Sequence, residues 1–296
     1  MVNRTAGNEK TPNCAKLRTS LDAIGRENSM PYTRLYLVAL ALLGPANALA
    51  ADPEVLRICY EAEDSLPFWG PAGDHGTPGQ GLVLDLIESA AKQAGLRLEL
   101  QRRPWKRCIL QLEQGLSDGI FAAIWQPERD VWGQFPGRDR QSNAPVQRSY
   151  RLWQVDYPII VRQGSALNWD GQQFSGTTNG LSAPLGYIAN QQLAALGVLA
   201  KPTYNAEIAL KLIALGRLDG YVLERQIAHY HIAQQGLQAQ LTLLPKPLFA
   251  ADWYLPLSHQ LYRQHPQVAQ RFWQALSEQR EAREAELSAR YLSGQD

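Results

Sequence analysis

The chain has 296 residues, 45% of them hydrophobic, which is enough for a substantial core and predicts two lobes. Its formal net charge is +1. Without residues 1–50, which hold six basic and three acidic residues, 23 basic and 25 acidic residues remain, so the net charge becomes −2. The sequence contains no basic stripe, and we therefore exclude nucleic acid as a partner.

The N-terminal region follows the order of an export signal. A positively charged start, Met30 to Arg34, precedes the apolar run Leu35 to Gly44, which is too short to span a bilayer. The small-x-small sequence Ala48-Leu49-Ala50 then offers a cleavage site before Ala51. The alternative is an amphipathic first helix, but the apolar run shows no polar face. We predict that residues 1–50 are an extension plus a cleaved signal peptide, and that the mature protein is periplasmic without a lipid anchor.

Three cysteines are present, and two of them, Cys59 and Cys108, follow the predicted cleavage site. An exported chain with two cysteines favours a disulfide between them, because the periplasm is oxidising. The alternative is a pair of buried free thiols. We predict the disulfide.

Hydrophobic patterns in the first half of the mature chain alternate between strand and helix. A loop with five glycines, Gly70 to Gly81, separates the first strand from the first helix. In chain order we predict strand, helix, strand, helix and strand at Leu56 to Tyr60, Val83 to Ala94, Leu96 to Leu100, Trp105 to Gln114 and Ile120 to Trp125. This order is typical of a parallel sheet flanked by helices.

The second half of the chain repeats this alternation of predicted strands and helices. The sequence Gly115-Leu-Ser-Asp118-Gly119 returns as Gly216-Arg-Leu-Asp219-Gly220, each time after a predicted helix. Further predicted elements are an apolar crossing at 152–161, a strand near Leu181, a helix ending near Gly197, a helix capped by Asn205, a return crossing at 241–247, a strand at 253–258 and a final helix from Pro266. We predict an α/β fold of two lobes joined by two crossing strands, with residues 51–151 and 249–296 in the first lobe and 152–248 in the second.

One arginine stands out by its position. Arg129 comes directly after the predicted strand Ile120 to Trp125, and ligands of open α/β sheets bind at the carboxyl ends of the strands. Its guanidinium group could hold a carboxylate through two parallel hydrogen bonds. The alternative is a surface arginine paired with Glu128 or Asp130.

The order of these segments resembles the extracellular solute-binding proteins of family 3, over about Leu56 to Ala275. The resemblance rests on six segments: Leu56 to Glu61 with Leu66-Pro67-Phe68, Gly79 to Asp85, Trp105 to Gly119, Gln126-Pro127-Glu128-Arg129, Gly186-Tyr187, and Asp219 to Glu224. It implies the periplasmic-binding-protein fold, in which two lobes close on a ligand. The segment before Arg129 departs from amino-acid-binding members, because Phe121 to Ile124 and Gln126 carry no hydroxyl group.

The resemblance also implies a set of site residues. Arg129 would hold a ligand carboxylate, and Glu224 would receive its ammonium group. Glu61 and Phe68 would lie on the first ligand loop, Trp105 would line the cleft, and Tyr187 would present its backbone N–H at a helix start. We add Trp69 and Trp125 because both fall on ligand-side loops or strand ends.

The expected function is capture of a small, polar, carboxylate-bearing ligand, amino-acid-like, for an inner-membrane ABC permease. We expect a monomer. We also expect no cofactor, because the sequence contains no phosphate loop or dinucleotide-binding motif. No metal site is expected, since His229 and His231 are not spaced to share one helix face. Two alternatives remain open: an enzyme similar to cyclohexadienyl dehydratase that uses Glu224 or Glu61 as acid or base, and a ligand-sensing accessory protein.

Overall fold

The computed structural model describes residues 52, 55–71, 80–139 and 144–292. The predicted signal peptide, its cleavage site and most of the glycine-rich loop lie outside these residues. None of the helices in the described ranges combines the length and apolar character that crossing a bilayer requires.

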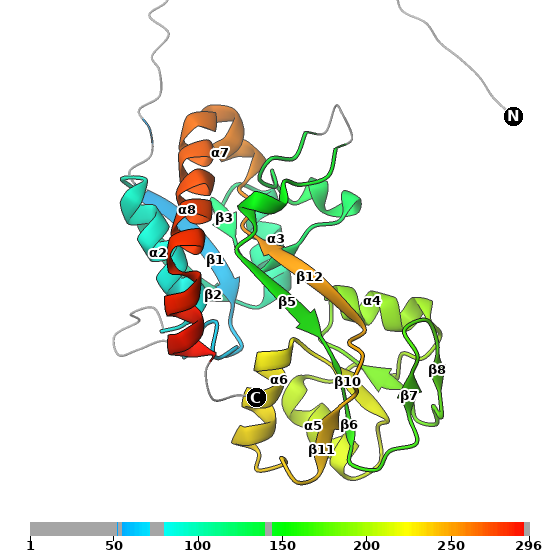
Figure 1. The fold of residues 1–296 in the computed structure, drawn as a ribbon. Helices are drawn as coiled ribbons and strands as arrows, with labels where there is room; N and C mark the ends of the chain where they lie inside the picture. The colour runs from blue at the N-terminus through cyan, green and yellow to red at the C-terminus, as the bar shows by residue number, and fades with distance from the viewer. Residues whose placement is uncertain (1–51, 53–54, 72–79, 140–143, 293–296) are drawn as a thin grey trace, which may run out of the picture. The chain divides into compact units, whose positions relative to one another are not determined.

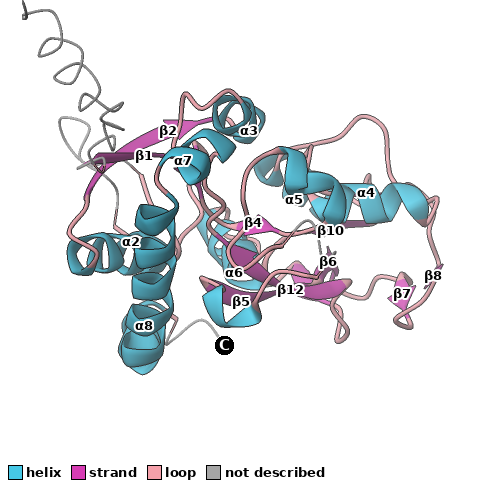
Figure 2. Ribbon diagram, turned by 90° about the horizontal axis from the view of Figure 1, so that it is seen from above, coloured by secondary structure: helices cyan, strands magenta, loops and turns pink. Residues whose placement is uncertain are grey.

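The first lobe contains the parallel sheet that the sequence predicts. Strands β1 (Val55–Glu61), β2 (Arg97–Arg103) and β3 (Gly119–Ile120) pair in the order β2-β1-β3, all in parallel. Helices α2 (Leu82–Gln93) and α3 (Trp105–Glu113) connect them. The long final helix α8 (Pro266–Tyr291) lies beside α2, as Figures 1 and 2 both show. Cys59 of β1 and Cys108 of α3 form a disulfide, as predicted, and so link the first strand to the second helix.

The second lobe holds a mixed sheet of four strands. Its order is β11 (Leu241–Leu243), β6 (Ile159–Arg162), β10 (Gly220–Val222) and β9 (Leu181–Ser182), of which only β9 and β10 run in parallel. Helices α4 (Ile188–Ala195), α5 (Ala206–Ala214) and α6 (Arg225–Gln234) accompany this sheet, and β7 (Asn168–Trp169) and β8 (Phe174–Ser175) form a small hairpin. The predicted cap of α5 is confirmed, because the Asn205 side chain accepts a hydrogen bond of 3.0 Å from the N–H of Ile208.

Two antiparallel strands run between the lobes. These are β5 (Trp153–Tyr157) and β12 (Phe249–Tyr254), which pair with each other, while β4 (Ala123–Ile124) pairs with β12 on its other side (Figure 1). The outward crossing was predicted within 152–161. The return crossing was predicted at 241–247, and this prediction is wrong: β11 belongs to the sheet of the second lobe, and β12 makes the return. The predicted strand at 253–258 overlaps only the end of β12.

The prediction of a single strand from Ile120 to Trp125 is also wrong. This segment forms two short strands, β3 in the first sheet and β4 in the crossing sheet, separated by Phe121 and Ala122. Ala122 has a φ of 59°, in the left-handed region that a non-glycine residue rarely adopts. The chain turns there because its two halves pair with different sheets. Arg129 therefore follows a strand that is antiparallel to its neighbour, not a strand of the parallel sheet.

The repeated Gly-x-x-Asp-Gly sequences have equivalent places in the two lobes. The Asp118 carboxylate accepts a hydrogen bond of 2.9 Å from the backbone N–H of Arg57 in β1. The Asp219 carboxylate accepts one of 2.8 Å from the backbone N–H of Gly180, next to β9. Each aspartate thus ties the strand that follows it to the neighbouring parallel strand.

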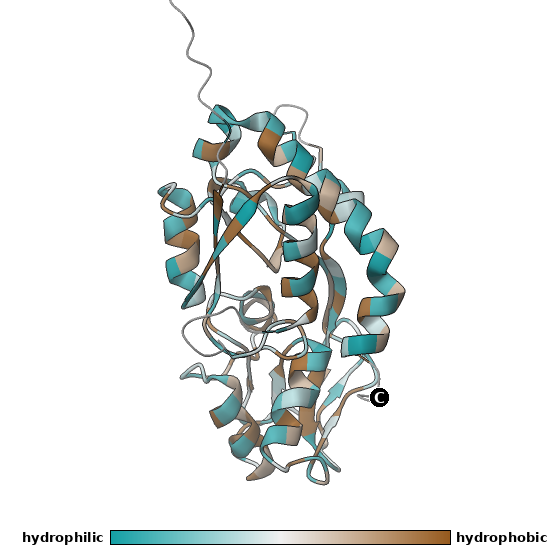
Figure 3. Cartoon of the chain, turned by 90° about the vertical axis from the view of Figure 1, so that its left-hand side faces the viewer, coloured by the Kyte–Doolittle hydropathy of each residue, from teal (hydrophilic) through white to brown (hydrophobic). Residues whose placement is uncertain are grey.

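Two helices of the structure have no counterpart among the predicted elements, α6 and the short α7 (His259–Gln264). In Figure 3 the helices change from hydrophobic to hydrophilic around their circumference, because one side of each packs on the protein interior. The buried side of α8 includes Phe272, Trp273 and Leu276.

Candidate functional site

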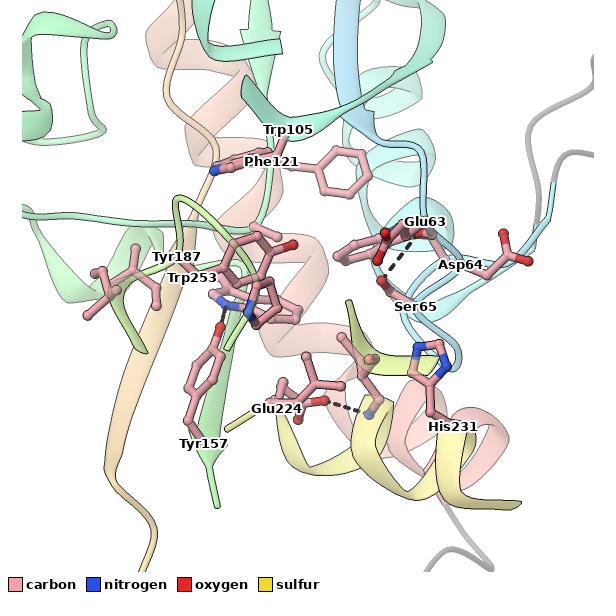
Figure 4. A pocket seen from close by; sticks show the side chains of 18 of the residues that line it. Glu63, Asp64, Ser65, Trp105, Phe121, Tyr157, Tyr187, Glu224, His231 and Trp253 are labelled. Carbon is pink, nitrogen blue, oxygen red and sulfur yellow. Dashed lines mark hydrogen bonds between the residues drawn. The ribbon is translucent and has the colours of Figure 1, made fainter. Parts of the chain in front are cut away.

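A cavity of about 50 Å³ lies where the two lobes meet the crossing strands. Five of the eight predicted site residues line it: Trp69, Trp105, Arg129, Tyr187 and Glu224. In Figure 4, Trp105 and Phe121 lie on one side of the cavity, and Tyr157 and Glu224 lie on the opposite side. The cavity therefore receives side chains from both lobes and from the strands between them.

The other three predicted residues are not among those that line the cavity. Phe68 is buried in the core, with its ring centre 4.8 Å from that of Trp253. The indole N–H of Trp125 donates a 2.9 Å hydrogen bond to the carboxylate of Asp130. The Glu61 carboxylate accepts hydrogen bonds from the N–H groups of Ala62 (2.7 Å) and Trp105 (3.2 Å). Glu61 thereby holds the turn after β1 against the first residue of α3.

Arg129 is a buried cation without a carboxylate partner among the described residues. It lies in a short 3₁₀ helix, Pro127–Val131, and its side chain donates a 3.0 Å hydrogen bond to the carbonyl oxygen of Ile124. The neighbouring Asp130 instead pairs with Arg138, at 2.8 Å. Arg129 is only 4% exposed, so the alternative of a surface ion pair is wrong. Burial lowers the pKa of Arg129 to about 10, which still leaves the group charged at neutral pH.

An aromatic series extends from Arg129 to the second lobe. The Arg129 guanidinium lies over the ring of Trp132, 4.4 Å from its centre. Trp132 meets Trp105 edge-on at 6.2 Å, and Trp105 meets Tyr187 at 6.5 Å. Sequence reasoning missed Trp132, although its place one turn after Arg129 was a usable signal. The backbone N–H of Tyr187, expected to face a ligand, donates instead to the carbonyl oxygen of Pro184 at 3.2 Å.

Glu224 follows β10, which ends at Val222, and caps the N-terminus of α6. It is 3% exposed, and its carboxyl oxygen Oε2 accepts a 2.9 Å hydrogen bond from the N–H of Ile227. Burial raises the pKa of Glu224 to about 8, while that hydrogen bond opposes the rise. The group is therefore protonated at neutral pH in this structure. Tertiary burial caused this shift, so the sequence carried no sign of it.

The crossing strands β5 and β12 contribute three lining residues that sequence reasoning missed, Tyr157, Phe249 and Trp253. Tyr157 closes β5, and its hydroxyl oxygen accepts a 2.9 Å hydrogen bond from the indole N–H of Trp253 in β12 (Figure 4). Seven aromatic residues line the cavity in all: Trp69, Trp105, Phe121, Tyr157, Tyr187, Phe249 and Trp253. The walls are mainly apolar with a few polar groups, an arrangement typical of small-molecule sites.

One end of the cavity is acidic. Glu63, Asp64 and His231 line it there, and Asp64 pairs with Arg102 at 2.6 Å. Burial raises the pKa of Glu63 and lowers the pKa of His231. Across the described ranges, no group of three or more histidine, cysteine, aspartate or glutamate side chains is arranged to hold a metal ion.

No protein-family model matches the sequence, and no curated protein is detectably similar to it. Solved structures, by contrast, are clearly similar. A histidine kinase sensor domain with similarity to periplasmic binding proteins is 18% identical, covers 82% of this chain and 97% of its own, and superposes with a TM-score of 0.63. The chain has the periplasmic-binding-protein fold.

Two further structures have the same fold. An ancestral arginine-binding protein bound to arginine is 18% identical, with coverage of 82% of this chain and 100% of its own and a TM-score of 0.63. An ancestral amino-acid-binding protein, a precursor of cyclohexadienyl dehydratase, is also 18% identical, with coverage of 80% and 95% and a TM-score of 0.60. These likenesses confirm the two-lobed fold that the sequence resemblance implied.

Proposed function

We propose that this protein is a periplasmic solute-binding receptor of family 3 that captures a small, carboxylate-bearing, amino-acid-like ligand. The observation that carries the proposal is the pairing of two buried groups around one cavity. Arg129 offers a cation without a carboxylate partner in the described ranges, and Glu224 offers a buried acid from the second lobe. A zwitterion carries a carboxylate that complements Arg129 and an ammonium group that complements the ionised form of Glu224.

Binding would use the two groups in different ways. The Arg129 guanidinium would hold the ligand carboxylate, and burial of the pair strengthens such a charge-assisted contact. Glu224 would lose its proton to meet the ligand ammonium group, because a nearby positive charge lowers a carboxyl pKa. Since the two residues come from different lobes, the ligand contacts both only when the lobes are closed. Ligand would therefore favour the closed form.

The proposed function also implies a membrane partner and export to the periplasm. The receptor would be a monomer and would deliver the ligand to an inner-membrane ABC permease. Residues 51–151 and 249–296 would form its first lobe, and residues 152–248 its second. The signal peptide would start at Met30 and would be cleaved near Ala51. Mass spectrometry of periplasmic material tests this step: we expect an N-terminus near Ala51, and a chain that retains Leu35 to Gly44 would contradict export.

A thermal-shift screen tests the binding function. The panel contains the L-amino acids, polyamines, dicarboxylates and aromatic acids, because a ligand that binds only the native state raises the melting temperature. We expect stabilisation by compounds that carry both a carboxylate and an ammonium group. Stabilisation by polyamines alone, or by no member of the panel, would contradict an amino-acid-like ligand.

The state of Glu224 favours one second candidate, an elimination enzyme. A carboxyl group with a pKa of about 8 is protonated at neutral pH and could act as a general acid towards a hydroxyl group that leaves as water. The precursor of cyclohexadienyl dehydratase that shares this fold is itself an amino-acid-binding protein, so the fold is compatible with both functions. Incubation with cyclohexadienyl acids, followed by ultraviolet absorbance of aromatic products, separates the two functions: turnover that Glu224→Gln abolishes supports the enzyme, and binding without turnover supports the receptor.

A further inference from the structure

Tyr157 is held rigidly at the junction of the two lobes. It is the last residue of β5 and lies opposite Phe249 of β12, with which its ring stacks at 4.5 Å. The residue is 4% exposed, and it lines the cavity together with Arg129 and Glu224. Packing on Phe249 and the hydrogen bond from Trp253 therefore fix both the plane of the ring and the position of its oxygen.

The hydroxyl group of Tyr157 can donate one hydrogen bond, and none of the described residues accepts it. Its oxygen accepts the 2.9 Å hydrogen bond from the indole N–H of Trp253, which is a donor only. The hydroxyl proton must therefore be donated elsewhere, and no protein acceptor for it is found within the described ranges. Burial raises the pKa of Tyr157, so the proton stays on the oxygen at neutral pH. A buried donor that lacks an acceptor is destabilising until something supplies one.

A ligand bound by Arg129 would supply this acceptor. Tyr157, Arg129 and Glu224 line the same cavity, and the positive charge of Arg129 acts on the Tyr157 hydroxyl. The segment before the arginine, Phe121 to Ile124, offers no hydroxyl donor of its own. A carboxylate held by one arginine has up to four acceptor positions and leaves some of them unused.

From this geometry we infer that Tyr157 is a ligand-binding residue whose hydroxyl group donates a hydrogen bond to the carboxylate held by Arg129. The inference rests on the proposed receptor function and adds a specificity residue to it. The crossing strand thereby supplies the hydroxyl donor that the turn around Arg129 lacks. A compound without an oxygen acceptor at this position would leave the buried hydroxyl proton unpaired and would bind more weakly.

Tyr221 offers a matched control on the same kind of side chain. It is fully buried in β10, and its hydroxyl group donates a 3.2 Å hydrogen bond to the carbonyl oxygen of Tyr204. Tyr221 is not among the residues that line the cavity. Both Tyr157→Phe and Tyr221→Phe remove one buried hydroxyl and keep the aromatic ring. A general loss of stability should therefore be common to the two variants, whereas a loss of affinity should not.

The test is isothermal titration calorimetry of wild type, Tyr157→Phe and Tyr221→Phe with the L-amino acids, after thermal melts have confirmed that each variant is folded. We expect Tyr157→Phe to bind about 10- to 100-fold more weakly than wild type, the loss typical of one hydrogen bond to a charged group. Tyr221→Phe should bind like wild type.

The possible outcomes separate the inference from the function on which it rests. If wild type binds an L-amino acid and Tyr157→Phe binds it equally well, the role of Tyr157 is wrong while the receptor function stands. Equal losses in both tyrosine variants would also overturn the inference, because the effect would then be general. If wild type binds no L-amino acid, the proposed function fails first, and the inference fails with it.

Discussion

The guanidinium group of Arg129 lies over the ring of Trp132, with its central carbon 4.4 Å from the centre of the ring. The aromatic face stabilises the buried cation without neutralising it, so the charge remains available to a ligand. A carboxylate partner in the protein would compete with the ligand for the same guanidinium. Arg138 differs from Arg129 in this respect, because its charge is already paired with Asp130 at 2.8 Å.

Replacing Trp132 should therefore weaken ligand binding. A cation–π contact contributes about 0.5–2 kcal/mol, so Trp132→Leu should lower affinity roughly 2- to 30-fold, and Trp132→Phe should lose less. Calorimetry with a ligand from the thermal-shift screen measures the effect. Trp169→Leu is the control, since Trp169 is a buried tryptophan outside the cavity lining. A similar loss of affinity in both variants would contradict a specific role for Trp132.

Glu224 should make the stability of the protein depend on pH. Its pKa is about 8 in the folded state and 4.5 as the ordinary value, so between these pH values the folded state keeps a proton that the unfolded state releases. The free energy of unfolding should therefore fall as pH rises from about 4.5 to 8, by about 1.4 kcal/mol for each pKa unit of difference.

Glu224→Gln isolates this contribution, because the amide keeps a cap acceptor and does not titrate. Urea denaturation of both proteins at pH 5 and pH 8.5 measures it. We expect the stability of wild type relative to Glu224→Gln to decrease by a few kcal/mol between the two pH values. An unchanged difference would show that Glu224 titrates normally.

The disulfide should stabilise the folded protein. Cys59 and Cys108 are 49 residues apart, and closing a loop of that length in the unfolded chain corresponds to about 4 kcal/mol. Reductant should lower the denaturation midpoint of wild type to that of the Cys59→Ala/Cys108→Ala variant, which itself should not respond to reductant. If Cys59 and Cys108 both react with a thiol reagent in the oxidised, denatured protein, the bond is not formed.

Local sequence patterns predicted those elements whose signals are local. The order of strands and helices in the first lobe, the Asn205 cap and the start of the last helix at Pro266 all appear in the structure. The break at Ala122 could not be predicted, because two different sheets decide it and the apolar run continues through it. The same holds for the return crossing, where two apolar segments lie close together in sequence and only sheet pairing separates them.

The candidate site likewise contains residues that the sequence could predict and residues that it could not. Arg129 could be proposed from its place after a predicted strand and Glu224 from the family resemblance, and both line the cavity. Tyr157 could not, because its hydrogen bond to Trp253 joins residues 96 positions apart. Phe68 and Trp125 are aromatic residues near strand ends, and composition alone does not separate a core position from a cavity position.

The central claim is that Arg129 binds the ligand carboxylate, and calorimetry on Arg129→Ala tests it most directly. Arg57→Ala is the control, because Arg57 is already paired with Asp118 at 2.9 Å and does not line the cavity. Breaking a charged pair in a closed cleft costs about 2–5 kcal/mol, so Arg129→Ala should bind roughly 30- to several-thousand-fold more weakly while remaining folded. Arg129→Lys should recover only part of the loss, since lysine lacks the planar fork. Equal affinities of wild type and Arg129→Ala for the ligand found in the screen would contradict the account at its centre.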